Sequence, residues 1–106
     1  MLSESQLQEI AKLLGDAARP AKVILFGSYA RGDADEGSDA DFLVIEPQIQ
    51  DRGCELIRLN RLLAPLGVPV DIMVYSEADV AQRGDWSSTA LYWALREGKL
   101  LYESAQ

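Results

Sequence analysis

The sequence predicts a single α/β domain in which helices flank a small β-sheet. Short apolar runs bounded by glycine or polar residues alternate with longer segments whose apolar residues recur every three or four positions. The first pattern is typical of buried strands and the second of amphipathic helices, and their alternation favours an α/β architecture. With 106 residues, 48% of them hydrophobic, the chain is long enough for one folded domain, residues 1–106, and too short for a second core.

The first half of the chain is expected to contain a long helix, two strands and a short helical turn between them. Ser3 and Gln6 form a capping-box pattern that predicts the start of the long helix, and Gly15 predicts its end. The acidic, glycine-containing segment 32–38 predicts a loop. The elements expected around this loop are a strand at residues 22–26, a short helix at 29–31 and a strand at 40–45.

The second half is expected to contain three helices and two further strands. A leucine stripe predicts a helix over residues 53–64, ended by Pro65. Alternation of apolar residues predicts a strand over 68–75, and Ser76 predicts the cap of a short helix after it. The remaining expected elements are a last helix that starts at Ser87 or Ser88 and is capped by Gly98, and a short strand at residues 99–102.

A Gly-Ser pair and an Asp-x-Asp pair are the residues that point to chemistry. Gly27 and Ser28 follow the first strand, where free backbone N–H groups and a hydroxyl can hold phosphate oxygens. Ten residues separate Ser28 from Asp39, and Asp41 follows at the start of the next strand, so the two aspartate side chains leave the same face. Carboxylates beside a phosphate cradle make a site for Mg²⁺. The motif therefore predicts nucleotidyl or phosphoryl transfer.

Asp71 supports the same site, because an aspartate within an otherwise apolar strand is disfavoured unless it has a partner or a metal. The alternatives are that Asp39 and Asp41 form an ordinary acidic turn, and that Asp71 lies on an exposed edge. Arg31 has two interpretations of similar weight. It is either a phosphate ligand with a bidentate guanidinium or a surface residue paired with a loop acid.

The Gly-Ser pair, the Asp-x-Asp pair and the later aspartate together resemble the signature of the DNA polymerase beta-like nucleotidyltransferase superfamily. The fuller pattern resembles its smallest branch, the minimal nucleotidyltransferases. The resemblance is dense over residues 23–45 and resumes at 70–74. It implies the nucleotidyltransferase fold, with a small mixed sheet flanked by helices, and ATP as a substrate.

The resemblance also implies a role for each residue of the site. Asp39 and Asp41 would ligate two Mg²⁺ ions, and Asp71 would complete one metal site and take the proton of the acceptor hydroxyl. The pair Gly27–Ser28 would hold the β- and γ-phosphates of ATP. Arg31 would add a nucleotide contact.

By the same resemblance, small proteins of this branch are often antitoxins paired with a HEPN-domain ribonuclease toxin, which they silence by adenylylating a tyrosine. The expected function is therefore AMP transfer from ATP to a hydroxyl of a partner protein. Two alternatives remain open. One is a binding-only antitoxin that occludes its partner. The other is transfer to a small molecule, as in the aminoglycoside nucleotidyltransferases. Those enzymes usually carry an additional helical domain, for which a chain of 106 residues has no room.

Charge and composition limit the partners. A net charge of −7 argues against direct nucleic acid binding, which needs clustered Lys and Arg. The sequence has no signal-peptide pattern and no apolar run of membrane-spanning length, so a cytoplasmic location without membrane contact is expected. The single Cys54 cannot form an internal disulfide. The aromatic-rich segment Trp86–Tyr102 has apolar residues on more than one helical face, which predicts a docking surface for a partner or a second copy.

Overall fold

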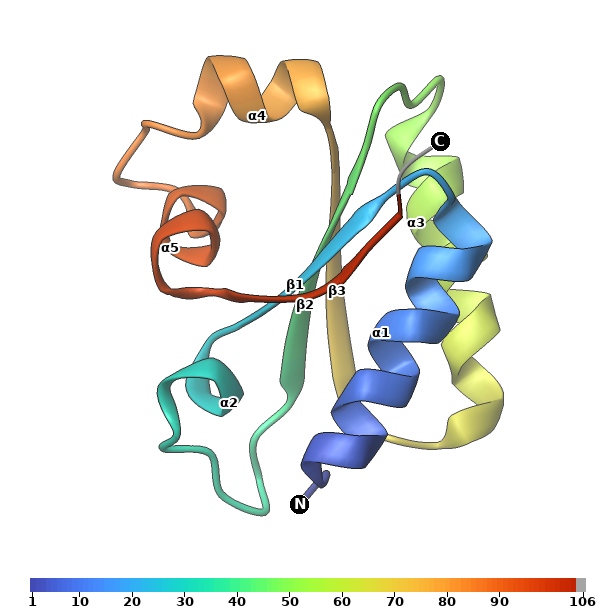
Figure 1. Cartoon of the computed structure of the whole chain (residues 1–106), viewed down its shortest axis with the longest axis vertical. Coiled ribbons are helices and arrows are strands. Elements are labelled where there is room, and N and C mark those ends of the chain that lie inside the picture. Colours follow the sequence, from blue (N-terminus) through green and yellow to red (C-terminus); the bar gives the residue numbers. More distant parts are fainter. Residues whose placement is uncertain (105–106) are drawn as a thin grey trace.

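A four-stranded sheet carries α1 and α3 on one face and α4 and α5 on the other, and the short α2 lies at one end of it (Figure 1). The computed structural model describes residues 1–104. Within this range no helix has the length and apolarity needed to cross a membrane. The elements are α1 (Glu4–Ala18), β1 (Lys22–Phe26), α2 (Ser28–Arg31), β2 (Ala40–Glu46), α3 (Arg52–Leu63), a 3₁₀ turn η1 (Ala64–Leu66), β3 (Val70–Ser76), α4 (Glu77–Arg83), α5 (Ala90–Glu97) and β4 (Lys99–Glu103).

The sheet is mixed, with strand order β3-β2-β1-β4. β2 and β3 run parallel, whereas β1 is antiparallel to both β2 and β4. The two central strands are therefore β1 and β2, which flank the predicted Gly-Ser and Asp-x-Asp pairs. The expected α/β domain with a small mixed sheet flanked by helices is confirmed, and all four expected strands are present.

The central strand β2 is buried on both of its faces. Phe42 and Val44 belong to the core formed with α1 and α3, whereas Leu43 and Ile45 belong to a second core formed with α5. Burying one such large side chain stabilises the fold by about 1.5–3 kcal/mol. Two covered faces explain why this strand reads as a continuous apolar run without alternation.

The predicted end of the first helix at Gly15 is wrong, because α1 continues to Ala18. A Cβ atom at Gly15 would collide with the ring of Tyr102 from β4. The Tyr102 hydroxyl donates a hydrogen bond to Asp16 Oδ1 at 2.7 Å. Gly15 therefore lets β4 pack closely on α1, and this contact outweighs the low helix propensity of glycine.

The predicted start of the last helix at Ser87 or Ser88 is also wrong. The helix begins at Ala90, with Thr89 as its N-cap residue. The Thr89 hydroxyl accepts a hydrogen bond from the Tyr92 backbone N–H at 3.2 Å. Serine and threonine stabilise a helix N-terminus to a similar extent. Because Ser87, Ser88 and Thr89 are consecutive, the sequence alone does not determine which of them is the N-cap residue.

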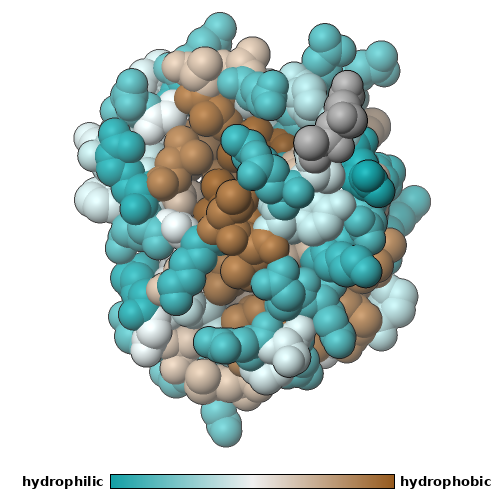
Figure 2. Space-filling model, viewed as in Figure 1, coloured by the Kyte–Doolittle hydropathy of each residue, from teal (hydrophilic) through white to brown (hydrophobic). Residues whose placement is uncertain are grey.

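The edge strand β4 is fastened to α1 by side chains. The Gln8 amide donates to the carbonyl oxygen of Leu101 at 2.6 Å, and a bulge at this point interrupts the pairing of β4 with β1. Both features blunt an edge against pairing with another chain. Leu100 is 52% exposed, and Figure 2 shows an apolar stripe through the middle of the face on which β4 lies.

Candidate active site

Asp41 and Asp71 lie next to each other on the parallel strands β2 and β3, where their Cα atoms are register partners. Side chains of register partners leave the same face of a sheet, which here is the face covered by α4 and α5. Asp39 precedes β2 by one residue, so the loop from α2 delivers it to the same end of the sheet. The structure thus brings the three predicted aspartates to one end of adjacent strands.

Asp39 and Asp71 are close enough to Asp41 to affect its ionisation. Burial raises the pKa of the half-buried Asp41, and the negative charges of Asp71 and Asp39 raise it further. The positive charge of Arg31 acts in the opposite direction. Like charges held together in this way favour binding of a cation, which would remove their repulsion.

The Gly27 backbone lies directly against the Asp41 carboxylate. Gly27 has φ = +74° and ψ = −152°, a conformation essentially restricted to glycine. A Cβ atom built at this position would collide with Asp41 Oδ2. Ser28 is the next residue and begins α2. The sequence motif therefore forms one continuous feature, a Gly-Ser turn packed onto the strand that carries the Asp-x-Asp pair.

Replacement of Gly27 by alanine is expected to abolish nucleotidyl transfer, because the new methyl group displaces the Asp41 carboxylate. Gly32→Ala is the matched control, since Gly32 also has a positive φ of 85° but would place its Cβ in open space. Gly32→Ala should lose about 1–2 kcal/mol of stability from left-handed backbone strain, and Gly27→Ala should lose more, because its φ and ψ are essentially restricted to glycine; thermal melting measures both. Only Gly27→Ala should lose activity beyond its folded fraction. Equal activities in the two variants would contradict the packing of the turn on Asp41.

Arg31 forms an ion pair with a loop acid, as expected if it is a surface residue. Its Nε lies 3.5 Å from Asp33 Oδ2, and both side chains are largely exposed. An exposed pair at this distance contributes little to stability. Because Arg31 also lowers the pKa of Asp41, its charge is available at the carboxylate cluster as well.

The donor set fits Mg²⁺. Among residues 1–104, no three Asp, Glu, His or Cys side chains converge closely enough to hold one ion between them. Mg²⁺ does not require such a cage, because it is usually bound by one or two carboxylates together with substrate phosphate oxygens and water. The aspartates supply carboxylate oxygens of that kind, and the Gly-Ser turn lies beside them.

Sequence reasoning missed a buried acid at the other end of β2. Glu46 is 8% exposed, and no donor among the described residues reaches its Oε2 atom. Burial raises the pKa of Glu46 to about 8, and the neighbouring Glu55 contributes to the increase. Glu46 therefore keeps its proton at neutral pH and donates it in a hydrogen bond to Glu55. The sequence feature that could have indicated this buried acid is a glutamate at the end of an apolar strand.

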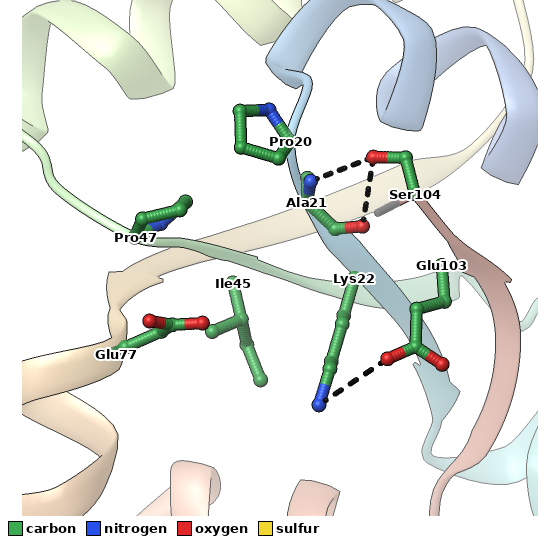
Figure 3. Close-up of a pocket in the computed structure, with 8 residues that line it drawn as sticks. All are labelled: Pro20, Ala21, Lys22, Ile45, Pro47, Glu77, Glu103 and Ser104. Carbon is green, nitrogen blue, oxygen red and sulfur yellow. Dashed lines mark hydrogen bonds and ion pairs between the residues drawn. The ribbon is translucent and has the colours of Figure 1, made fainter. Parts of the chain in front are cut away.

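The partners of Glu55 connect this acid pair to the helices. Arg58 donates two hydrogen bonds to Glu55, at 2.8 and 2.7 Å, and a third to the carbonyl oxygen of Ala17 in α1 at 3.0 Å. A cavity of about 350 Å³ also lies at this end of the sheet, between the start of β1 and the end of β2. Figure 3 shows the Lys22–Glu103 ion pair on its wall. Neither feature is near the aspartate cluster.

The fold and the site define a nucleotidyltransferase domain. Residues 5–92 match the nucleotidyltransferase domain family, and the chain belongs to this family. It is 36% identical over 104 residues to a protein of Methanocaldococcus jannaschii that is named as a candidate protein adenylyltransferase, and the match covers 96% of this chain and 100% of that protein. A second M. jannaschii protein named in the same way is 53% identical over 38 residues, 36% of each chain.

Solved structures give the same assignment. A candidate minimal nucleotidyltransferase is 34% identical, with a TM-score of 0.58 and coverage of 91% of this chain and 92% of that one. A chain of a toxin–antitoxin crystallised with AMP-PNP is 26% identical, with a TM-score of 0.66 and coverage of 92% and 73%. The complex of a tri-AMPylated Shewanella oneidensis HEPN toxin with its MNT antitoxin contains a chain of the same fold, with 24% identity, a TM-score of 0.57 and coverage of 93% and 72%. The predicted family and nucleotidyltransferase activity are confirmed.

Proposed function

We propose that this domain transfers AMP from ATP to a tyrosine hydroxyl of a partner protein, and that it acts in the cytoplasm as the antitoxin of a HEPN-domain ribonuclease toxin. The observation that carries the proposal is the position of Asp41, which lies in register with Asp71 on one side and against the Gly27 turn on the other. Acidic ligands and a phosphate-binding turn are thereby adjacent, as AMP transfer requires.

In the proposed reaction the acceptor oxygen forms a bond to the α-phosphorus of ATP. The bond from that phosphorus to the oxygen bridging to the β-phosphate breaks, and pyrophosphate leaves. Asp71 is exposed on the edge strand β3, where it can take the proton of an incoming hydroxyl. Ser28 and the backbone of its turn hold the β- and γ-phosphates, and Arg31 adds positive charge beside them. Mg²⁺ held by aspartate carboxylates of this site together with phosphate oxygens of ATP would neutralise the charge of the triphosphate.

Two similarities support a protein as the acceptor. The M. jannaschii relative matched over its whole length is named as a candidate protein adenylyltransferase. A chain of similar fold occurs in a toxin–antitoxin with AMP-PNP, an ATP analogue. The strong negative charge of the domain further argues against a nucleic acid acceptor.

Incubation with ATP labelled at the α-phosphate tests the proposal directly. Label should appear on the partner protein when ATP, Mg²⁺ and this domain are all present, and ATP labelled at the γ-phosphate should leave the partner unlabelled. Transfer of the γ-label would identify a kinase. A partner that is inhibited without acquiring label would identify an occluding antitoxin.

The docking surface proposed for the partner comprises the exposed apolar side chains in and next to α5, which are Trp86 before the helix, Trp93 within it and Leu100 in β4. These side chains are 56%, 52% and 52% exposed. Trp93 is oriented by a hydrogen bond from its Nε1 to the Ser87 carbonyl oxygen at 3.1 Å and by an edge-on contact with Tyr92. Exposed, preoriented tryptophans are typical of residues that dominate interface energetics.

Trp93→Ala is expected to weaken partner binding by at least tenfold and to slow transfer to the partner, because a large apolar contact is lost. ATP binding and the melting temperature should change little, since Trp93 lies outside the core. Leu66→Ala is the control, because Leu66 is 47% exposed in η1, which directly follows α3 and is distant in sequence from α5. Pull-down, calorimetry and thermal melting measure these effects. Unchanged partner affinity together with a lower oligomeric state would instead assign the surface to a second copy.

A further inference from the structure

The hydrogen bonds within the short helix α2, which begins at Ser28, are too few to fix its orientation in the domain. α2 has four residues, and glycines with positive φ stand at both of its ends, Gly27 at +74° and Gly32 at +85°. Its internal hydrogen bonds are few, including Arg31 N–H to Gly27 O and Gly32 N–H to Ser28 O, each 3.0 Å long. A single helical turn is unstable in isolation, and glycine at each end permits rotation of the turn. Its orientation therefore depends on the side chains that attach it to the rest of the domain.

Tyr29 supplies the polar attachment. Its ring packs against the core shared with α1 and α3. Its hydroxyl accepts a hydrogen bond from the backbone N–H of Leu2 at 3.0 Å, across a separation of 27 residues. Ala30 is buried in the same core but, as a methyl group, it limits rotation less. Arg31, the last residue of the turn, is exposed.

The donor of this hydrogen bond, the Leu2 N–H, has a fixed position at the start of α1. Leu2 directly precedes Ser3, the N-cap residue of the fifteen-residue helix α1. The Ser3 hydroxyl accepts from the Gln6 N–H at 3.1 Å, and the Ser3 N–H donates to Gln6 Oε1 at 2.8 Å. This capping box fixes the backbone at the head of the helix. The Tyr29 hydroxyl is thus tied to one of the longest rigid elements of the domain.

We propose that Tyr29 is a positioning residue for the nucleotide. The bond between its hydroxyl and the Leu2 N–H fixes the turn that presents Ser28 and the backbone N–H groups to the phosphates of ATP. This inference rests on the proposed function. In the proposed reaction Tyr29 touches no reacting atom. It affects ATP binding by fixing the orientation of Ser28, its neighbour in the turn.

Loss of the hydroxyl lowers the fraction of molecules whose turn is correctly oriented, and apparent affinity falls in proportion to that fraction. Tyr29→Phe is expected to weaken ATP binding about three- to tenfold and to raise the KM for ATP equally, with kcat within twofold of wild type. Tyr102→Phe is the matched control, because it removes a tyrosine hydroxyl bound to Asp16 of α1, away from the turn. It should leave the Kd for ATP unchanged.

Three measurements test the inference: titration with ATP and Mg²⁺, steady-state transfer kinetics, and amide hydrogen exchange without nucleotide. In the Tyr29→Phe protein the Arg31 and Gly32 amides should exchange faster, whereas Tyr102→Phe should leave them as in wild type. Equal ATP affinity in wild type and Tyr29→Phe would overturn the inference. Equal weakening by both substitutions would do the same, because it would indicate general loosening of α1.

The exchange measurement separates this inference from the proposed function. If wild type fails to bind ATP, the proposed function is refuted and the positioning role is refuted with it, whatever the exchange rates. If wild type binds and transfers normally while exchange at Arg31 and Gly32 is unaffected by Tyr29→Phe, the positioning role alone is refuted.

Discussion

Asp41→Asn is expected to reduce AMP transfer by about a hundred- to a thousandfold or more, a loss of the size seen when preorganised charge stabilisation is removed. The substitution keeps the shape of the side chain and removes its charge. Asp41 is the aspartate in contact with both halves of the site, the Asp71 register position and the Gly27 turn. Its loss should therefore affect metal and phosphate binding together.

The same substitution should not destabilise the protein in the absence of nucleotide. The pKa of Asp41 is raised by burial and by Asp71 and Asp39, so its ionised form opposes folding at neutral pH. Asparagine removes that repulsion, and the melting temperature should stay constant or rise. A clear fall would show that Asp41 has a structural role.

Glu36→Gln is the control for Asp41→Asn, since it removes one negative charge from an exposed position of the neighbouring loop. Transfer of α-phosphate label should remain near wild type in this variant. Protection against the partner's activity separates catalysis from occlusion. If Asp41→Asn protects as well as wild type while transferring no label, inhibition depends on binding, and the proposal of catalytic silencing is wrong.

Glu46→Gln is expected to stabilise the folded protein by about 3 kcal/mol at pH 7. Folding raises the pKa of Glu46 from its ordinary value of 4.5 to about 8, so the folded state must take up a proton at neutral pH. Each unit of difference between pH and the unfolded pKa costs 1.36 kcal/mol. Glutamine can donate the same hydrogen bond to Glu55 without taking up a proton.

The pH dependence of this effect has a definite sign. Below pH 4.5 Glu46 is protonated in both states and its contribution to stability is complete; as pH rises from 4.5 to about 8 that contribution is lost. Denaturant unfolding of the wild type should therefore show falling stability between pH 5 and 8, and the Glu46→Gln protein a shallower decline.

The control for this measurement is Glu103→Gln, which removes an exposed partner of Lys22. Its effect should stay within about 0.5 kcal/mol at every pH. Parallel pH profiles for wild type and Glu46→Gln would show that Glu46 is not the group that takes up the proton.

The sequence predicts the part of the site that depends on strand pairing and register. Gly27-Ser28 and Asp39-x-Asp41 flank two apolar runs, and pairing of those runs is enough to bring them together. The same logic correctly places Asp71 beside Asp41, although Asp71 is exposed on the edge strand β3, as the alternative interpretation predicted. What the spacing could not supply is the direct packing of Gly27 on Asp41, because that depends on a backbone conformation.

Other features depend on contacts between distant segments and leave only weak local signals. Gly15 reads as a helix stop, although its role is to accommodate a ring from β4. Glu46 has the local pattern of a polar strand end, although it is buried and the neighbouring Glu55 helps to raise its pKa. In each case a tertiary contact overrides local propensity.

The attachment of β4 to α1 has a consequence for synthesis on the ribosome. Gln8 and Asp16 contact Leu101 and Tyr102, residues 93 and 86 positions later in the chain. Until the segment up to Glu103 has emerged, β1 has no neighbour on one side, and a central strand is left as an open edge. Contacts of such wide sequence separation form slowly, and an open edge meanwhile favours pairing between nascent chains. Arrival of the last strand therefore covers the open edge of β1 and completes the sheet.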